Sequence, residues 1–186
     1  METYRLRVFY EKSGAAVFIS GRNMLKIIER TFRRTGAPLK FTEGFSPHPK
    51  ISFGHPLPLN VSGSNESFDV FLCEKIDPAE VIGKTPDVLP EGIVFRKARW
   101  MDRSAPSING SETFAKYTVE TEGTIDTETL EKYGRILSTE KNRIEILIKI
   151  NNFSHKGLTE MLLGGAVKKI SREILNEDAI STFDKQ

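Results

Sequence analysis

The stretch from residue 44 to residue 63 gathers side chains that could do chemistry. It contains four prolines and two of the three histidines of the chain, His48 and His55. Imidazole is a frequent zinc ligand and a frequent general base near neutral pH. The spacing of the two histidines is unlike that of zinc-binding motifs, and no cysteine lies near them. We therefore predict no metal site here.

The prolines and glycines of this stretch favour a stiff loop. Each proline fixes a φ angle and removes an N–H donor, and glycine permits backbone conformations that other residues resist. His48 lies between two prolines, so it either locks the loop through a backbone hydrogen bond or faces a ligand. Ordered loops on rigid scaffolds often carry function. Phe45, Ser46 and His48 are therefore candidate binding residues.

A run of basic residues precedes the loop. Residues 1–60 contain 10 Lys and Arg against 4 Asp and Glu, whereas residues 61–186 contain 17 against 21. Four of the cations recur every three or four residues, which places them on one face of a predicted helix. These four are Arg22, Lys26, Arg30 and Arg33. Such a stripe is either the solvated side of an amphipathic helix or a surface that attracts phosphates.

For a phosphate-binding surface, the candidate residues are drawn from this helix and from the connection after it. They are Arg22, Lys26, Arg33, Arg34 and Lys50. Arg5, Arg7 and Phe9 also share one face of a predicted strand, as in sheet proteins that stack RNA bases on aromatic rings.

The elements that must position these residues follow from hydrophobic periodicity. Alternating patterns predict strands at 4–10, 67–73 and 93–100. A helix begins after Ser20 and ends near Gly36, with Ile28 and Phe32 facing the first strand, and Asp77 starts a second, short helix. Either 38–42 or 51–53 supplies the remaining strand. The resulting order, strand–helix–strand–strand–helix–strand, is that of the ferredoxin-like, or split βαβ, fold.

The second half of the chain repeats part of this pattern. Residues 101–114 are polar and predict a linker between a first unit at 1–100 and a second, shorter unit at 115–186. The elements expected in the second unit are strands at 116–122, 143–150 and 166–175 and helices at 127–137 and 157–165. The segment 166–175 suits a helix almost as well, and the strand completes the repeat. We therefore predict an α+β protein with two ferredoxin-like halves and antiparallel sheets.

Residues 18–69 resemble a known family, the radical SAM-linked proteins, which are fused to or encoded beside a radical SAM enzyme. The motifs that carry the resemblance are Phe18-Ile19-Ser20, Glu29-Arg30, Arg33-Arg34, Gly44-Phe45-Ser46-Pro47-His48-Pro49, Ser52-Phe53, Pro56-Leu57-Pro58-Leu59, and Glu66 with Asp69. After the serine the family pattern has His, Leu and Asp, whereas this chain has Gly21, Arg22 and Asn23. The resemblance implies a radical SAM enzyme as partner.

Several chemistries are excluded by residue content. A radical SAM cluster needs three cysteines, and this chain has one, Cys73. The sequence lacks a phosphate-binding P-loop and a dinucleotide-binding glycine motif, so we expect no cofactor. No apolar run is long enough to span a bilayer, and the N-terminal sequence lacks the apolar core of a signal peptide. We expect a cytoplasmic location and no membrane partner.

These observations favour a non-catalytic recognition or adaptor module. It would work with a radical SAM enzyme and present a basic face to RNA or to another phosphate-rich substrate. The first alternative is an RNA-processing enzyme of the nuclease type, with His48 or His55 as general base. The second alternative is a module that docks only to proteins through its proline-rich loop.

Overall fold

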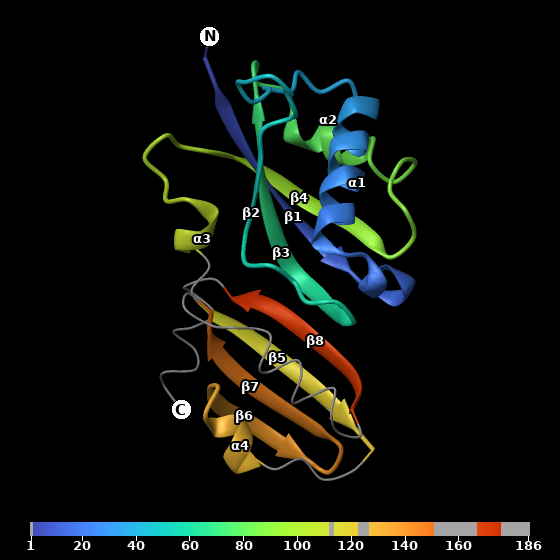
Figure 1. Ribbon diagram of the computed structural model, residues 1–186, viewed down its shortest axis with the longest axis vertical. Coiled ribbons are helices and arrows are strands. Elements are labelled where there is room, and N and C mark those ends of the chain that lie inside the picture. Colours follow the sequence, from blue (N-terminus) through green and yellow to red (C-terminus); the bar gives the residue numbers. More distant parts are fainter. Residues whose placement is uncertain (1, 112–113, 123–126, 151–166, 176–186) are drawn as a thin grey trace.

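The computed structural model describes residues 2–111, 114–122, 127–150 and 167–175. The described part of the chain is an α+β protein with few helices, and its eight strands form one mostly antiparallel sheet. Figure 1 shows α1 and α2 beside the upper half of this sheet and β8 between its upper and lower halves. No described helix combines the length and the apolar character that crossing a membrane requires.

The first half of the chain has the strand order predicted from the sequence. Its elements are β1 (Tyr4–Lys12), the 3-10 helix η1 (Gly14–Phe18), α1 (Gly21–Arg34), β2 (Ile51–Phe53), β3 (Val61–Leu72), α2 (Pro78–Gly83) and β4 (Ile93–Met101). In the sheet the order is β4, β1, β3, β2, and each pairing is antiparallel. Helix α1 follows β1, and α2 joins β3 to β4, as in a split βαβ unit.

Helix α1 has its apolar side on the sheet. The Ser20 hydroxyl caps it by accepting a hydrogen bond from the Asn23 amide at 3.3 Å. Ile28 and Phe32 are fully buried in the same cluster as the inward-facing residues of β1. The ring centroid of Phe32 lies 6.0 Å from that of Phe68 in β3. The predicted direction of the helix is confirmed by this burial.

The second half repeats the strand order. It contains α3 (Ile108–Ser111), β5 (Phe114–Thr121), α4 (Thr127–Glu131), β6 (Arg135–Glu140), β7 (Arg143–Lys149) and β8 (Val167–Leu175). The strands are ordered β8, β5, β7, β6 and pair antiparallel. The strand predicted at 166–175 is confirmed as β8. The helix predicted at 157–165 lies outside the described residues.

One predicted helix is shorter than expected. The sequence pattern extended a helix from 127 to 137, but α4 ends at Glu131 and β6 begins at Arg135. Gly134 explains the early end, because a Cβ atom at this position would lie 2.2 Å from the carbonyl oxygen of Leu147. The turn therefore packs directly on β7, and pairing with β7 outweighs the helical periodicity.

The two halves are joined in one sheet, which the sequence pattern did not predict. Strand β3 is 12 residues long. It pairs with β2 near its C-terminal end and, at residues 61–64, with β8 in parallel. Asn65, which has a positive φ of 55°, lies between these two regions, and its side-chain amide donates to the carbonyl of Ile174 at 2.7 Å.

Each half has its own cluster of buried apolar residues. The first cluster lies between α1, α2 and the strands of the first half, and the second lies on β5, β7 and β8. Val61, at the start of β3, belongs to the second cluster. Phe68, Val70 and Leu72, later in the same strand, belong to the first. Strand β3 thus contributes to both cores. The division into units at 1–100 and 115–186 stays a prediction.

Candidate functional site

The predicted basic stripe lies on the exposed side of α1. We call the residues Arg22, Lys26, Arg30, Arg33 and Arg34 the basic face of α1, and all five are exposed. None of them forms an ion pair with any residue that the structure describes. Like charges four residues apart on a helix repel one another. A bound anion would relieve this repulsion.

The proline-rich connection begins as a small hairpin, residues 39–50, which we call the loop hairpin. Phe41 pairs with Pro49 in an isolated β-bridge, and the Lys50 amide donates to the carbonyl of Lys40 at 2.7 Å. At its tip the Thr42 amide donates to the carbonyl of His48 at 2.8 Å, and the Thr42 hydroxyl accepts from the His48 amide at 3.1 Å. The backbone of His48, rather than its ring, therefore closes the loop.

The loop hairpin presents its predicted residues to solvent. Phe45, Ser46 and His48 are all exposed, and the relative exposure of Phe45, 109%, is that of a ring with no packing partner. The hairpin also meets the basic face of α1, because the guanidinium carbon of Arg33 lies 5.2 Å from the ring centroid of Phe41. The two predicted regions thus form one surface. Lys50 lies instead over the Phe71 ring, 4.8 Å from its centroid.

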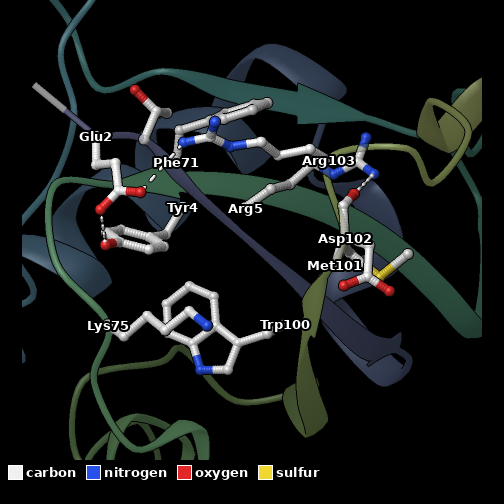
Figure 2. A pocket seen from close by; sticks show the side chains of 10 residues that line it. Glu2, Tyr4, Arg5, Phe71, Lys75, Trp100, Met101, Asp102 and Arg103 are labelled. Atoms are coloured by element: carbon white, nitrogen blue, oxygen red, sulfur yellow. Dashed lines mark hydrogen bonds and ion pairs between the residues drawn. The ribbon is translucent and has the colours of Figure 1, made fainter.

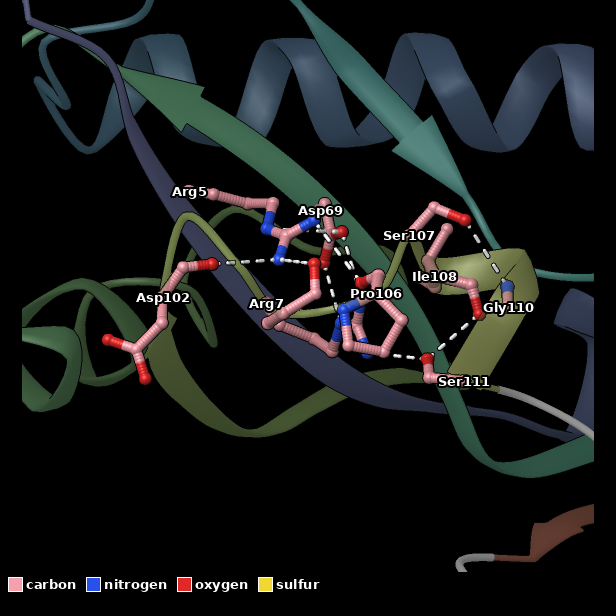
Figure 3. Close-up of polar contacts among 10 residues, drawn as sticks. Arg5, Arg7, Asp69, Asp102, Pro106, Ser107, Ile108, Gly110 and Ser111 are labelled. Carbon is pink, nitrogen blue, oxygen red and sulfur yellow. Dashed lines mark hydrogen bonds and ion pairs between the residues drawn. The ribbon is translucent and has the colours of Figure 1, made fainter.

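The structure contradicts the prediction of a base-stacking face at Arg5 and Arg7. Arg7 is buried and donates to both carboxylate oxygens of Asp69, at 2.7 and 3.0 Å, and to the hydroxyl of Ser111 at 2.7 Å. Arg5 donates to backbone carbonyls of the 101–114 segment, including that of Ala105 at 2.8 Å. Figure 3 shows residues of this segment from Asp102 to Ser111 beside β1, the strand that carries both arginines. The described part of the predicted linker, residues 101–111, is therefore docked on the sheet, and its Ile108 is buried.

A second buried ion pair joins the two halves. The guanidinium of Arg172 in β8 has no exposed surface and donates to both carboxylate oxygens of Glu66 in β3, at 2.8 and 2.5 Å. Its remaining N–H groups reach the carbonyls of His55 at 2.8 Å and Pro56 at 3.0 Å. Burial opposes the charge, but Glu66 and Tyr117 outweigh it and raise the pKa of Arg172. The pair therefore stays charged and fixes the backbone at 55–56.

This fixed backbone forms one wall of a cavity of about 260 Å³, which we call the Lys12 pocket. The pocket is lined by Tyr10, Lys12, Ile19, Gly21, Met24, Phe53, Gly54, His55, Pro56, Leu57 and Ser67. Segments far apart in the sequence thus converge here: the end of β1, the start of α1 and the chain after β2. Residues 19, 53, 56 and 57 belong to the motifs that carry the family resemblance. Sequence patterns singled out some of these residues, His55 among them, but they did not indicate that these residues enclose a pocket with Lys12.

Lys12 is the cation of this pocket. Its side chain lies on the core side of the sheet, and only 3% of the residue is exposed. The ammonium donates to the carbonyl of Ile19 at 3.1 Å. Burial lowers the pKa of Lys12, the nearby carboxylate of Glu66 counteracts this, and Arg172 adds to the lowering. A buried amine with a lowered pKa is typical of functional sites.

A larger groove of about 420 Å³ lies at the end of the first-half sheet. Tyr4 and Trp100 meet there edge to face, with ring centroids 6.2 Å apart (Figure 2). Its charges are partly satisfied within the groove, because Glu2 accepts hydrogen bonds from the Tyr4 hydroxyl and from Arg103. The groove is therefore a weaker candidate than the surface formed by α1 and the loop hairpin.

The two histidines of the proline-rich stretch lie in different surroundings. His48 is exposed in the loop hairpin, whereas His55 lines the Lys12 pocket and its carbonyl accepts from Arg172. Among the described residues, no group of three or more His, Cys, Asp and Glu side chains is arranged to hold a metal ion. The absence of a metal stays a prediction.

The comparisons with known proteins give a family and distant likenesses to solved structures. The bacterial family described as "Uncharacterized protein conserved in bacteria" (DUF2344) matches residues 5–181. No curated protein matches. Among solved structures, the small subunit of acetolactate synthase from Thermotoga maritima is 13% identical, with coverage of 95% of this chain and 98% of that one and a TM-score of 0.31. A TM-score this low supports no argument.

Proposed function

We propose that this chain, which belongs to the uncharacterized bacterial family matched over residues 5–181, is a non-catalytic recognition module that binds RNA or another phosphate-rich ligand. The binding surface consists of the basic face of α1 and the loop hairpin. We propose further that it works beside a radical SAM enzyme, which rests on the sequence motifs alone, and that its second half completes a second ferredoxin-like unit.

One observation carries the binding proposal. The cations of α1 are exposed and free of ion pairs within the described part of the chain, whereas many other exposed cations meet a carboxylate. Five like charges on one helix face destabilise the helix unless counterions or a ligand neutralise them. Phosphates of a nucleic acid would do so and would release bound counterions into solution.

The loop hairpin supports a ligand with aromatic rings as well as phosphates. Phe45 stands away from the protein on a hairpin closed by hydrogen bonds, so its backbone is held in place and its ring is accessible to a ligand. Aromatic side chains stack on unpaired bases, with a contribution of about 1–3 kcal/mol per base. Single-stranded RNA combines the phosphates and the bases that this surface accommodates.

Binding of fluorescent single-stranded RNA at several salt concentrations tests the proposal. We expect the logarithm of the association constant to fall linearly with the logarithm of salt concentration, by about 0.7 for each phosphate neutralised. The experiment contradicts the proposal if no salt-dependent binding appears at low ionic strength. In that case the exposed Phe45 and the loop hairpin are better explained as a docking edge for a protein.

The same assay separates a binding module from a nuclease. In a nuclease that uses His48 as general base, His48→Ala abolishes cleavage while RNA remains bound. In a binding module, the wild-type protein leaves the RNA intact, and the substitution changes affinity only modestly. Gel analysis of the RNA recovered from each binding reaction distinguishes these results.

A further inference from the structure

We infer that the Lys12 pocket receives one unstacked nucleobase of the RNA strand bound by the basic face of α1. This inference rests on the proposed function and adds to it a site that reads the base. The ligand class is a base with a carbonyl oxygen, such as uracil or guanine, and the base-reading group is the amine of Lys12.

The lining of the pocket suits a flat ring with a polar edge. Most of its side chains are apolar, including those of Ile19, Met24 and Leu57, and the ring of Phe53 adds an aromatic surface. A cavity of about 260 Å³ lies below the roughly 300–1,000 Å³ of sites for drug-sized ligands. It therefore suits one base rather than a longer piece of the chain.

Lys12 supplies the polar contact at the edge of that ring. An ammonium carries three N–H donors, and the carbonyl of Ile19 accepts from only one of them. A buried donor without an acceptor costs free energy, because it has given up its hydrogen bonds to water. A carbonyl oxygen of a bound base would accept one of the remaining N–H groups. Adenine has no carbonyl oxygen, and its exocyclic amino group is a donor that would face the ammonium in place of an acceptor. We therefore expect the pocket to prefer uracil to adenine.

The position of the pocket connects it to the basic face of α1. Gly21 lines the pocket, and Arg22, the first cation of the basic face, follows it in the first turn of the helix. This turn has no acidic residue, and the helix is 14 residues long. A phosphate beside the inserted base would therefore meet both the positive end of the helix dipole and Arg22.

The pocket is held in shape before any ligand binds. The guanidinium of Arg172 fixes the carbonyls of His55 and Pro56, so the wall they form cannot collapse into the cavity. The Asn60 amide also donates to the carbonyl of Val17 at 3.0 Å. This bond joins the segment after Leu57 to the one before Ile19, and both of these residues line the pocket. A preformed site loses less conformational entropy on binding.

The test measures affinity for short oligouridine and oligoadenine with three variants. Lys12→Met removes the donor at similar length. Gly21→Leu adds a bulky side chain to a residue that lines the pocket and does not alter a buried charge. Apart from its chain neighbours and the backbone of its own helix, no atom lies within 4 Å of the Cβ position there. Gly83→Leu in α2 is the matched control, because its Cβ position is equally open and lies outside the pocket lining.

We expect the wild-type protein and Gly83→Leu to prefer oligouridine about tenfold. Lys12→Met and Gly21→Leu should both lose this preference while keeping the salt dependence of binding. If Lys12→Met does not fold, Gly21→Leu decides the question alone. The base-pocket inference is overturned if the wild type does not distinguish the two oligomers, or if Gly21→Leu retains the preference. Loss of all salt-dependent binding in the wild type overturns the proposed function itself.

Discussion

The two halves of this protein share a strand order but use their charges differently. In the second half, Lys116, Arg143, Lys168 and Lys169 each meet a carboxylate at 2.7 to 3.9 Å. In the first half, the basic face of α1 has no such partners among the described residues. A repeated fold therefore does not imply a repeated use of charge, because several cations of the second half pair with carboxylates whereas those of the basic face of α1 do not in the part of the chain that the structure describes.

The buried arginines extend this comparison. Arg7 pairs with Asp69 within the first half and holds the docked 101–114 segment through Ser111. Arg172 belongs to the second half but pairs with Glu66 of the first half and fixes the wall of the Lys12 pocket. The second half thus contributes one side chain, that of Arg172, to the wall of the Lys12 pocket.

The largest expected loss of stability comes from the core of the first half. Phe32→Ala should lower the free energy of unfolding by about 3 to 5 kcal/mol, because Phe32 is fully buried among other aromatic rings. Urea denaturation followed by the fluorescence of Trp100, which lies in the same half, measures this loss. A loss below about 1 kcal/mol would contradict the observed orientation of α1.

Arg172→Ala should break the connection between the halves at a cost of about 3 kcal/mol, because it leaves Glu66 buried without its partner. The fluorescence of Trp100 and the far-UV circular dichroism of the whole chain should then report different midpoints in urea. Arg143→Ala is the control, since its exposed pair with Glu145 contributes less than about 1 kcal/mol. Coincident midpoints with little loss for Arg172→Ala would show that the halves do not depend on this pair.

The difference in charge use predicts a difference in RNA binding. Replacing both Arg33 and Arg34 by alanine should reduce the salt slope by about 1.4, the contribution of two phosphates on a single strand. Replacing both Lys168 and Lys169, whose charges already meet Glu122 and Glu120, should leave the slope unchanged. Both double variants should unfold within about 0.5 kcal/mol of the wild type per substitution. Equal slopes for the two variants would remove the distinction between the halves.

The smallest effect concerns the protonation of Lys12. Its pKa is lowered in the folded state, so the folded protein releases this proton at a lower pH than the unfolded chain does. Between the lowered folded pKa and the unfolded value near 10.5, the stability of the wild type should therefore rise with pH relative to that of Lys12→Met. Denaturant titrations of both proteins from neutral pH upward test the sign. A wild type that loses stability relative to the variant would contradict burial of the charge.

The sequence was informative where one element determines its own structure. Ser20 and Asp77 cap their helices as predicted, and the alternation in 143–150 buries Ile144 and Ile146 on one face. The strand at 166–175 was also correct, because its inward positions alternate even though a helix would have suited three of them.

The sequence was not informative where distant segments meet. Alternation placed Arg5 and Arg7 on the outer face of β1, but it could not show that residues 101–111 cover that face. Lys12 continues the inward pattern of Tyr10 and could have been noted as a cation in a core position. Its surroundings depend on pairing between β3 and β8, which no local pattern encodes.

Glu66 and Arg172 are separated by 106 residues along the chain. This separation determines when, during synthesis, the wall of the Lys12 pocket can form. A ribosome releases the first half long before β8, and contacts between distant residues form slowly. Until β8 has been synthesised, the Glu66 carboxylate cannot pair with the Arg172 guanidinium, and the carbonyls of residues 55 and 56 lack their hydrogen bonds to it. Synthesis of β8 is therefore a checkpoint, because only a chain elongated past Arg172 can fix this wall of the Lys12 pocket.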